Sequence, residues 1–249
     1  MSTKIAIITD IHGNWPALRA ALFEIDSLHE VQHIYCLGDM IGIGPDTNEV
    51  LQALFSRVDM SYVSGNHDEA VLALIKGEAY PESHFHSKRH HEWIAERMDK
   101  SFVPLLDGLP RVIRTVEEGQ SQLFTHYHID RDKLKDPIST DPFSPIVEPS
   151  LRNLEMLFDG CQEQLIAFGH HHPIHYFRSD KQVFVNPGSL GCNDKSTARY
   201  AIITLSNQGI EVQLREAEYD NSAFLASYAK LDVPEREFIL RIFHGNQVR

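Results

Sequence analysis

Eight polar side chains that suit metal binding or proton transfer follow predicted strands, each at the point where its strand ends. They are Asp10, His12, Asp39, Asn66, His67, His126, His170 and His172. Carboxylate, imidazole and amide groups without a thiolate form a set of ligands that suits Mn²⁺, Fe²⁺ or Fe³⁺, or Zn²⁺. The set is too large for one ion, and two ions about 3.5–4 Å apart would need one carboxylate between them. Asp39 is the expected bridge, because its strand is predicted to lie beside those of Asp10 and Asn66.

The first of these strands, residues 4–8, is a continuous apolar run rich in β-branched residues. Such a run predicts a fully buried strand of a parallel sheet. Open α/β sheets bind ligands at the carboxyl ends of their strands, where Asp10 and His12 lie. Two positions apart in an extended chain, these side chains point to the same side and can bind one ion. For this triplet alone, the alternative is a turn in which Asp10 and Asn14 only satisfy backbone groups.

The elements that position these residues begin with three strands, each followed by a helix. The strands are predicted at 4–8, 33–37 and 60–63, and Asn14 can cap the first helix. Successive strand–helix units predict a parallel sheet with right-handed crossovers, so the three polar clusters lie at one edge. Short turns between late strands favour a second, antiparallel-rich sheet. The later strands are predicted at 111–116, 121–125, 165–168, 174–178, 182–185, 200–205 and 210–214.

Two helical segments complete a chain that we predict to be a single domain over residues 1–249. Residues 219–249 are predicted to form C-terminal helices, and residues 77–109 a helical insertion. The insertion is rich in histidine, and two interpretations of it remain open. It is either a lid that contacts the substrate or a solvated helix with no chemical role. Its histidines are His84, His86, His90 and His91.

Composition narrows the function classes. The chain has 249 residues and a formal net charge of -12, which argues against general binding of nucleic acids or anionic membranes. Three cysteines are an odd number with no paired spacing, so we expect no disulfide framework and a reducing, cytoplasmic compartment. No apolar run approaches the length of a membrane span. A small phosphorylated substrate stays compatible with the acidic balance, because bound metal ions supply local positive charge.

Five motifs in order resemble those of the calcineurin-like metallophosphoesterases, and most closely the YfcE-like bacterial phosphodiesterases. The motifs are D-x-H from Asp10, G-D-x-x-G from Gly38, G-N-H-D from Gly65, a strand-end His126 and G-H-x-H from Gly169. The fold implied is α/β, with two mixed β-sheets packed face to face and flanked by helices. Tyr127 stands where the family commonly has glycine, with another histidine at 128. We assign the ligand to His126 because it lies at the strand end.

The resemblance also implies roles for individual residues. Two divalent metal ions are implied, Mn²⁺ first, with Fe, Zn or Ni as alternatives. A hydroxide that bridges the ions would attack phosphorus, and His67 would protonate the leaving group with Asp68 orienting it. One ion would be held by Asp10, His12, Asp39 and His172, and the other by Asp39, Asn66, His126 and His170.

The function implied is hydrolysis of phosphodiester or phosphoanhydride bonds in a small substrate, with nucleotides the first choice. The loop from Gly38 to Pro45 also resembles that of proteins related to diadenosine tetraphosphatases, so a dinucleoside polyphosphate is the leading specific substrate. A phosphoprotein phosphatase is a further alternative. The retromer subunit of this family uses the fold as a protein scaffold, but this chain retains every ligand, which favours an enzyme. The sequence does not determine the oligomeric state.

Overall fold

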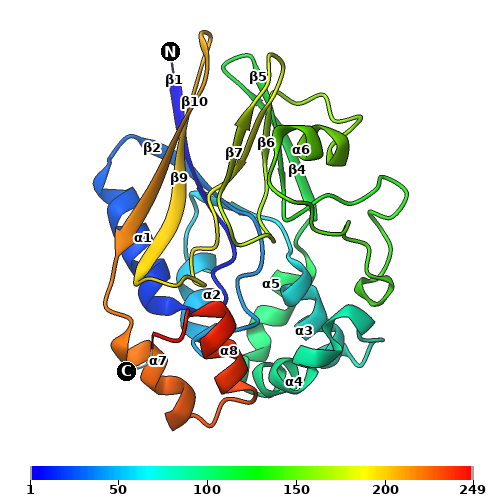
Figure 1. Ribbon diagram of the computed structural model, residues 1–249, viewed down its shortest axis with the longest axis vertical. Helices are drawn as coiled ribbons and strands as arrows, with labels where there is room; N and C mark the ends of the chain where they lie inside the picture. Colours follow the sequence, from blue (N-terminus) through cyan, green and yellow to red (C-terminus); the bar gives the residue numbers. More distant parts are fainter. Residues whose placement is uncertain (1, 248–249) are drawn as a thin grey trace.

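The computed structural model describes residues 2–247 and contains two five-stranded sheets that pack face to face (Figure 1). The first sheet consists of β1 (Ser2–Ile8), β2 (Val31–Cys36), β3 (Met60–Tyr62), β9 (Thr197–Ser206) and β10 (Gly209–Glu218). Its strand order is β10-β9-β1-β2-β3. β2 runs parallel to β1 and β3, whereas β9 pairs antiparallel with β1 and with β10. The sheet is therefore mixed.

The second sheet consists of β4 (Val112–Glu117), β5 (Gln120–Thr125), β6 (Leu165–Ala167), β7 (His175–Arg178) and β8 (Val183–Asn186). Its strand order is β4-β5-β6-β8-β7. The three central strands are parallel, and each edge strand pairs antiparallel with its neighbour. This sheet is also mixed, and the predicted fold of two mixed sheets flanked by helices is confirmed.

Helices cover the outer face of each sheet (Figure 1). The first sheet is covered by α1 (Trp15–Ser27), α2 (Thr47–Phe55), α3 (Asn66–Lys76), α4 (Lys88–Arg97), α5 (Val103–Asp107), α7 (Ser222–Lys230) and α8 (Arg236–Phe243). The second sheet is covered by α6 (Leu151–Leu157). Three short 3₁₀ turns are η1 (Glu82–Ser87), η2 (Lys100–Phe102) and η3 (Ile138–Thr140). No helix in residues 2–247 is long and apolar enough to cross a membrane.

The first strand is buried on both faces, as its continuous apolar run predicts. Ile5 and Ile7 pack into the core between the two sheets, whereas Ala6 and Ile8 pack against the helices. The alternation follows from the two-residue period of a strand. Asn14 then caps α1, because its Oδ1 accepts a hydrogen bond of 3.1 Å from the backbone N–H of Ala17. The predicted start of this helix is confirmed.

Three expectations differ from the structure. The late strands β9 and β10 do not join the second sheet, because β9 pairs with the edge of β1 that β2 leaves free. α3 begins at Asn66, so Asn66 and His67 lie in the first turn of a helix and not in a loop at the end of a strand. In the insertion His90 and His91 are buried, which contradicts a solvated helix.

Candidate metal centre

The predicted ligands meet at one edge of the sandwich. Loops after β1, β2, β5 and β6 carry them, together with the first turn of α3. Backbone hydrogen bonds join neighbouring loops. The N–H of His12 donates to the carbonyl of Asp39 at 2.9 Å, and that of Gly169 donates to the carbonyl of His126 at 2.8 Å. The ligand-bearing loops thus hold one another in place through the backbone.

A first group of possible ligands consists of Asp10, His12 and His172, whose ligand atoms all lie within 4.8 Å of one another. Nε2 of His12 lies 3.7 Å from Oδ1 of Asp10 and 3.1 Å from Nε2 of His172. Nε2 of His172 lies 3.6 Å from the same Asp10 oxygen. Three ligand atoms that converge in this way can hold a single cation.

A second group consists of Asp39, His126 and His170, again with ligand atoms within 4.8 Å of one another. Nε2 of His126 lies 3.3 Å from Oδ2 of Asp39 and 2.9 Å from Oδ1 of Asn66. His128, the other histidine after β5, instead contacts the hydroxyl of Ser144 and belongs to neither group. The structure thus places His126, and not His128, among the possible ligands.

Asp39 lies between the two groups. Its Oδ2 is 3.7 Å from Nε2 of His12 and 3.3 Å from Nε2 of His126. Its other oxygen, Oδ1, accepts a 2.8 Å hydrogen bond from the backbone N–H of His67. One oxygen is therefore fixed by the protein while the other faces both groups, which is the arrangement that a bridging carboxylate needs.

Asp10 is oriented in a similar way. Its Oδ2 accepts hydrogen bonds from the hydroxyl of Thr9 at 2.7 Å and from the backbone N–H of His170 at 3.0 Å. Its Oδ1 is buried without a hydrogen-bond partner. A buried carboxylate oxygen costs free energy unless a partner satisfies it. A cation in the first group would provide that partner, so the residues present fit a metal ion.

Two of the imidazole rings are held with Nε2 toward the site. Nδ1 of His12 lies 3.2 Å from the carbonyl of Ile41, and Nδ1 of His126 lies 2.7 Å from the carbonyl of Leu37. A carbonyl only accepts, so each Nδ1 donates its proton and each Nε2 keeps a lone pair in the neutral ring. Histidines that bind metal through one ring nitrogen commonly donate the N–H of the other nitrogen to a carbonyl in this way.

The electrostatics of the site favour positive charge beside Asp39. Burial alone would raise the pKa of Asp39, but His126, His67 and His12 together hold it well below its usual range. Burial would likewise lower the pKa of His126, but Asp39 outweighs it and raises that pKa to about 9. The Asp39 carboxylate is therefore ionised although it is buried, and it would attract divalent cations.

Four of the ligand residues have left-handed backbone conformations. The φ angles are 52° at Asp10, 50° at His12, 50° at Asp39 and 67° at His170. The expectation that Asp10 and His12 lie in extended chain is therefore wrong, although their side chains converge as predicted. Such conformations cost about 1–3 kcal/mol each outside glycine and tend to cluster at functional sites.

His67 and Asp68 make different contacts from those expected. The carboxylate of Asp68 accepts backbone hydrogen bonds from Gly65 at 3.0 Å and Ile41 at 3.2 Å. Nδ1 of His67 instead lies 2.8 Å from Nε2 of His91 in α4. Burial lowers the pKa of His67 well below its usual value, and Asp39 opposes this effect. In the described geometry an imidazole, not a carboxylate, orients the ring.

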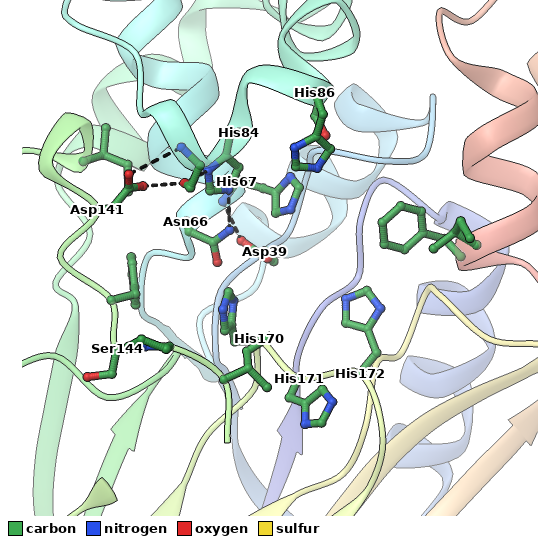
Figure 2. A pocket seen from close by; sticks show the side chains of 18 of the residues that line it. Asp39, Asn66, His67, His84, His86, Asp141, Ser144, His170, His171 and His172 are labelled. Atoms are coloured by element: carbon green, nitrogen blue, oxygen red, sulfur yellow. Dashed lines mark hydrogen bonds between the residues drawn. The ribbon is translucent and has the colours of Figure 1, made fainter. Parts of the chain in front are cut away.

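The insertion reaches the ligands at a second point. Nε2 of His84 lies 2.8 Å from Nδ2 of Asn66 (Figure 2). Oδ1 of the same amide faces His126, at 2.9 Å from its Nε2. Nδ1 of His84 lies 2.7 Å from the hydroxyl of Ser83. The concentration of histidine in 84–91 indicated a possible lid, but the contacts of His84 with Asn66 and of His91 with His67 were not predicted.

A cavity of about 650 Å³ opens above the two groups (Figure 2). Its floor includes the predicted residues Asp39, Asn66, His67, His170 and His172. Its walls come from η1, from the 138–146 segment and from the end of α8. This volume is typical of small-molecule sites, which range from about 300 to 1,000 Å³.

Comparison with known proteins assigns a family to this arrangement. Residues 3–208 match the calcineurin-like phosphoesterase superfamily domain. The chain belongs to this superfamily. The resemblance inferred from the five motifs is therefore confirmed, and membership of the superfamily supports a phosphoesterase hydrolase with metal-binding residues.

Similar proteins cover nearly the whole chain. An uncharacterized protein of Methanocaldococcus jannaschii is 25% identical over 94% of this chain and 96% of its own. A hypothetical protein from Pyrococcus horikoshii has the same fold at a TM-score of 0.76, with 20% identity over 98% of each chain. A metallophosphoesterase from Sphaerobacter thermophilus has the same fold at a TM-score of 0.71, with 22% identity over 97% of this chain and 98% of its own.

A shorter stretch of the chain is similar to a nucleotide hydrolase. The symmetrical bis(5'-nucleosyl)-tetraphosphatase of Buchnera aphidicola is 34% identical over 71 residues. The aligned region is 28% of this chain and 26% of the Buchnera enzyme.

Proposed function

We propose that the chain, as a single domain, is a dinuclear metal-dependent phosphoesterase that hydrolyses small phosphodiesters, with nucleotides as the first substrate class. The observation that carries this proposal is Oδ2 of Asp39, which lies 3.7 Å from Nε2 of His12 and 3.3 Å from Nε2 of His126. One free carboxylate oxygen between two groups of possible ligands supports two ions and not one.

The residues present would divide between two divalent ions. Asp10, His12, Asp39 and His172 would hold one, and Asp39, Asn66, His126 and His170 the other. Mn²⁺ is the first choice, with Fe, Zn or Ni as alternatives, since the ligands are nitrogen and oxygen atoms. When bound, the ions supply positive charge for the phosphoryl oxygens and lower the pKa of a coordinated water from about 15.7 to roughly 7.

His67 is the proposed general acid at the leaving oxygen. Its Nδ1 faces His91, so Nε2 is the nitrogen left for the substrate. Burial opposes the protonated ring, but the Asp39 carboxylate favours it. Asp68 supports this role at a distance, because its carboxylate fixes the backbone of Gly65 at the start of α3.

Two other substrate classes compete with a nucleotide diester. The 71-residue similarity to the Buchnera tetraphosphatase favours a dinucleoside polyphosphate. A phosphoprotein phosphatase has less support, because the cavity of about 650 Å³ suits a small molecule. A scaffold without activity is least favoured, since every predicted ligand lies at the site. The free cysteines Cys36, Cys161 and Cys192 support our proposal of a reducing, cytoplasmic location.

The test is metal content together with Mn²⁺-dependent hydrolysis of bis-p-nitrophenyl phosphate by protein stripped with a chelator. We expect two metal equivalents and restored activity. Asp39→Asn should lose metal, whereas His67→Ala should keep both ions and lose turnover. His128→Ala is the matched control and should keep both the metal ions and the turnover of the wild type. Equal metal loss in Asp39→Asn and His67→Ala would refute the assigned roles, and no metal with no activity would refute the function.

A further inference from the structure

The walls of the cavity are apolar on two opposite sides. Figure 2 shows the segment with Asp141 and Ser144 on one side of the ligands and α8 on the other. From the first segment, Ile138, Phe143, Pro145 and Ile146 line the cavity, and we call them the loop wall. From the other side, Pro173, Ile242 and Phe243 line it, and we call them the helix wall.

Each wall lies against a different group of ligands. The ring of Phe143 in the loop wall is 6.2 Å from that of His170 and nearly parallel to it, at 19°. The ring of Phe243 in the helix wall is 5.7 Å from that of His172. The two aromatic rings therefore flank the site from the side of the second group and from the side of the first.

Part of each wall is open to solvent. Ile146 in the loop wall is 49% exposed, and Ile242 in the helix wall is 55% exposed. Single exposed apolar residues need no explanation, but two that face one cavity above polar ligands form a surface that a bound molecule can cover.

The charge of the lining limits what that molecule can be. Among the described residues that line the cavity none is Lys or Arg, and the carboxylates are those of Asp39 and Asp141. The whole chain carries a formal charge of -12. A polyphosphate would bring several negative charges, of which the two ions could neutralise only those next to them. A single phosphoryl group needs no cation beyond the metal centre.

We propose that the substrate has one phosphoryl group between two apolar or aromatic groups, one against each wall, and is not a polyphosphate. A phosphodiester of two aryl or nucleoside groups has this form. Its hydrolysis consumes one water, breaks one P–O bond and yields a monoester and an alcohol. This inference rests on the proposed function and selects the diester over the dinucleoside polyphosphate.

The test measures the binding of three ligands to the Mn²⁺-loaded chain by calorimetry. Two of them are phosphinates, whose phosphorus–carbon bonds resist hydrolysis. Diphenylphosphinate has one charge and two rings, dimethylphosphinate has the same charge without rings, and tripolyphosphate has several charges. We expect diphenylphosphinate to bind at least about tenfold more tightly than either of the others.

Variants assign the two rings to the two walls. Phe143→Ala and Phe243→Ala should each weaken the binding of diphenylphosphinate about tenfold and leave the binding of dimethylphosphinate unchanged. Phe23→Ala is the control, because Phe23 is 73% exposed on α1 and does not line the cavity. Ile146→Lys and Ile242→Lys change exposed positions without disturbing the core. Each of these two variants should bind diphenylphosphinate more weakly and tripolyphosphate more tightly than the wild type does.

Three results would overturn the inference. Tripolyphosphate could bind more tightly than diphenylphosphinate, all four wall variants could leave diphenylphosphinate binding unchanged, or Phe143→Ala and Phe243→Ala could weaken both phosphinates equally. The last result would mean that the rings only pack on the ligand histidines. If bis-p-nitrophenyl phosphate is still hydrolysed, the proposed function stands and only the substrate class fails. If no ester is hydrolysed, both fail.

Discussion

Nδ1 of His67 lies 2.8 Å from Nε2 of His91, and Nδ1 of His91 lies 2.8 Å from the hydroxyl of Tyr80. His91 is fully buried in α4 of the helical insertion. The insertion therefore orients the residue that we propose as the general acid. The hydroxyl of Tyr80 also donates to the carbonyl of His84 at 3.2 Å, so the insertion fixes Nδ1 of His67 through this hydrogen-bond chain and leaves Nε2 of His67 for the cavity.

Substitution of His91 tests this relationship. His91→Phe removes the partner of His67 and should lower kcat about 10–100-fold with little change in KM. The loss should be larger for an alkyl ester than for a p-nitrophenyl ester, because a poor leaving group depends more on a proton. His91→Gln keeps an N–H donor and should recover part of the activity. Metal content should stay at the wild-type value. Equal loss for both leaving groups would contradict the positioning role.

The positions of the candidate ligands could be predicted from the sequence because each of these residues follows an apolar strand. Residues such as Asp39 and His126 occupy strand ends, and a parallel arrangement brings strand ends to one edge whatever the loops do. The five motifs added an order that few folds share. For these residues local pattern and tertiary position agree.

The contacts of the insertion could not be predicted in this way. His84 in η1 and His91 in α4 reach Asn66 and His67 only where the insertion packs against α3, which no local spacing specifies. The place of β9 depended on which strand edge stayed free, and that too is a tertiary property. The family resemblance implied that Asp68 orients His67, but in the first turn of a helix its carboxylate is closer to free backbone N–H groups.

Gly65 is predicted to be essential for the geometry of the bridging carboxylate. A Cβ at this position would lie 2.2 Å from the backbone nitrogen and from Oδ1 of Asp39. Gly65→Ala must therefore displace Asp39, and we expect a loss of about 1–3 kcal/mol of stability together with weaker metal binding. Gly108→Ala is the control, since its nearest neighbour is the Pro104 carbonyl at 3.3 Å. Calorimetric Mn²⁺ titration and chemical unfolding measure both effects. Unchanged metal affinity in Gly65→Ala would contradict the prediction.

Arg111 is predicted to stabilise the helix that carries Asn66 and His67. Its guanidinium donates to both carboxylate oxygens of Glu69 in the first turn of α3, at 2.8 Å and 2.6 Å. The two side chains are only 13% and 16% exposed, so Arg111→Met leaves a largely buried carboxylate without its partner. We expect a loss of about 2–4 kcal/mol in urea unfolding.

Arg236 offers the matched control, because its ion pair with Asp232 is 41% exposed on the arginine side and 90% exposed on the aspartate side. Arg236→Met should cost less than about 1 kcal/mol. A loss of similar size in both variants would mean that the pair at α3 contributes no more than a surface contact.

Asp46 gives a prediction for the pH dependence of stability. Burial raises the pKa of this carboxyl to about 6, with a further contribution from Glu49. Between pH 4 and pH 6 the folded chain therefore holds a proton that the unfolded chain has lost, so this group lowers stability as the pH rises. Asp46→Asn removes the effect. The difference in melting temperature, Asp46→Asn minus wild type, should therefore be more positive at pH 7.5 than at pH 4.

Asp99 provides the opposite sign as a control. The backbone N–H and hydroxyl of Ser101 lower the pKa of its carboxyl, so the ionised form stabilises the fold above the unfolded pKa and this contribution is lost in acid. The difference in melting temperature, Asp99→Asn minus wild type, should therefore be more negative at pH 7.5 than at pH 4. Because both variants are compared with wild type at each pH, titration of the metal ligands cancels in the difference. Shifts of the same sign in the two variants would show that neither reports the named carboxyl.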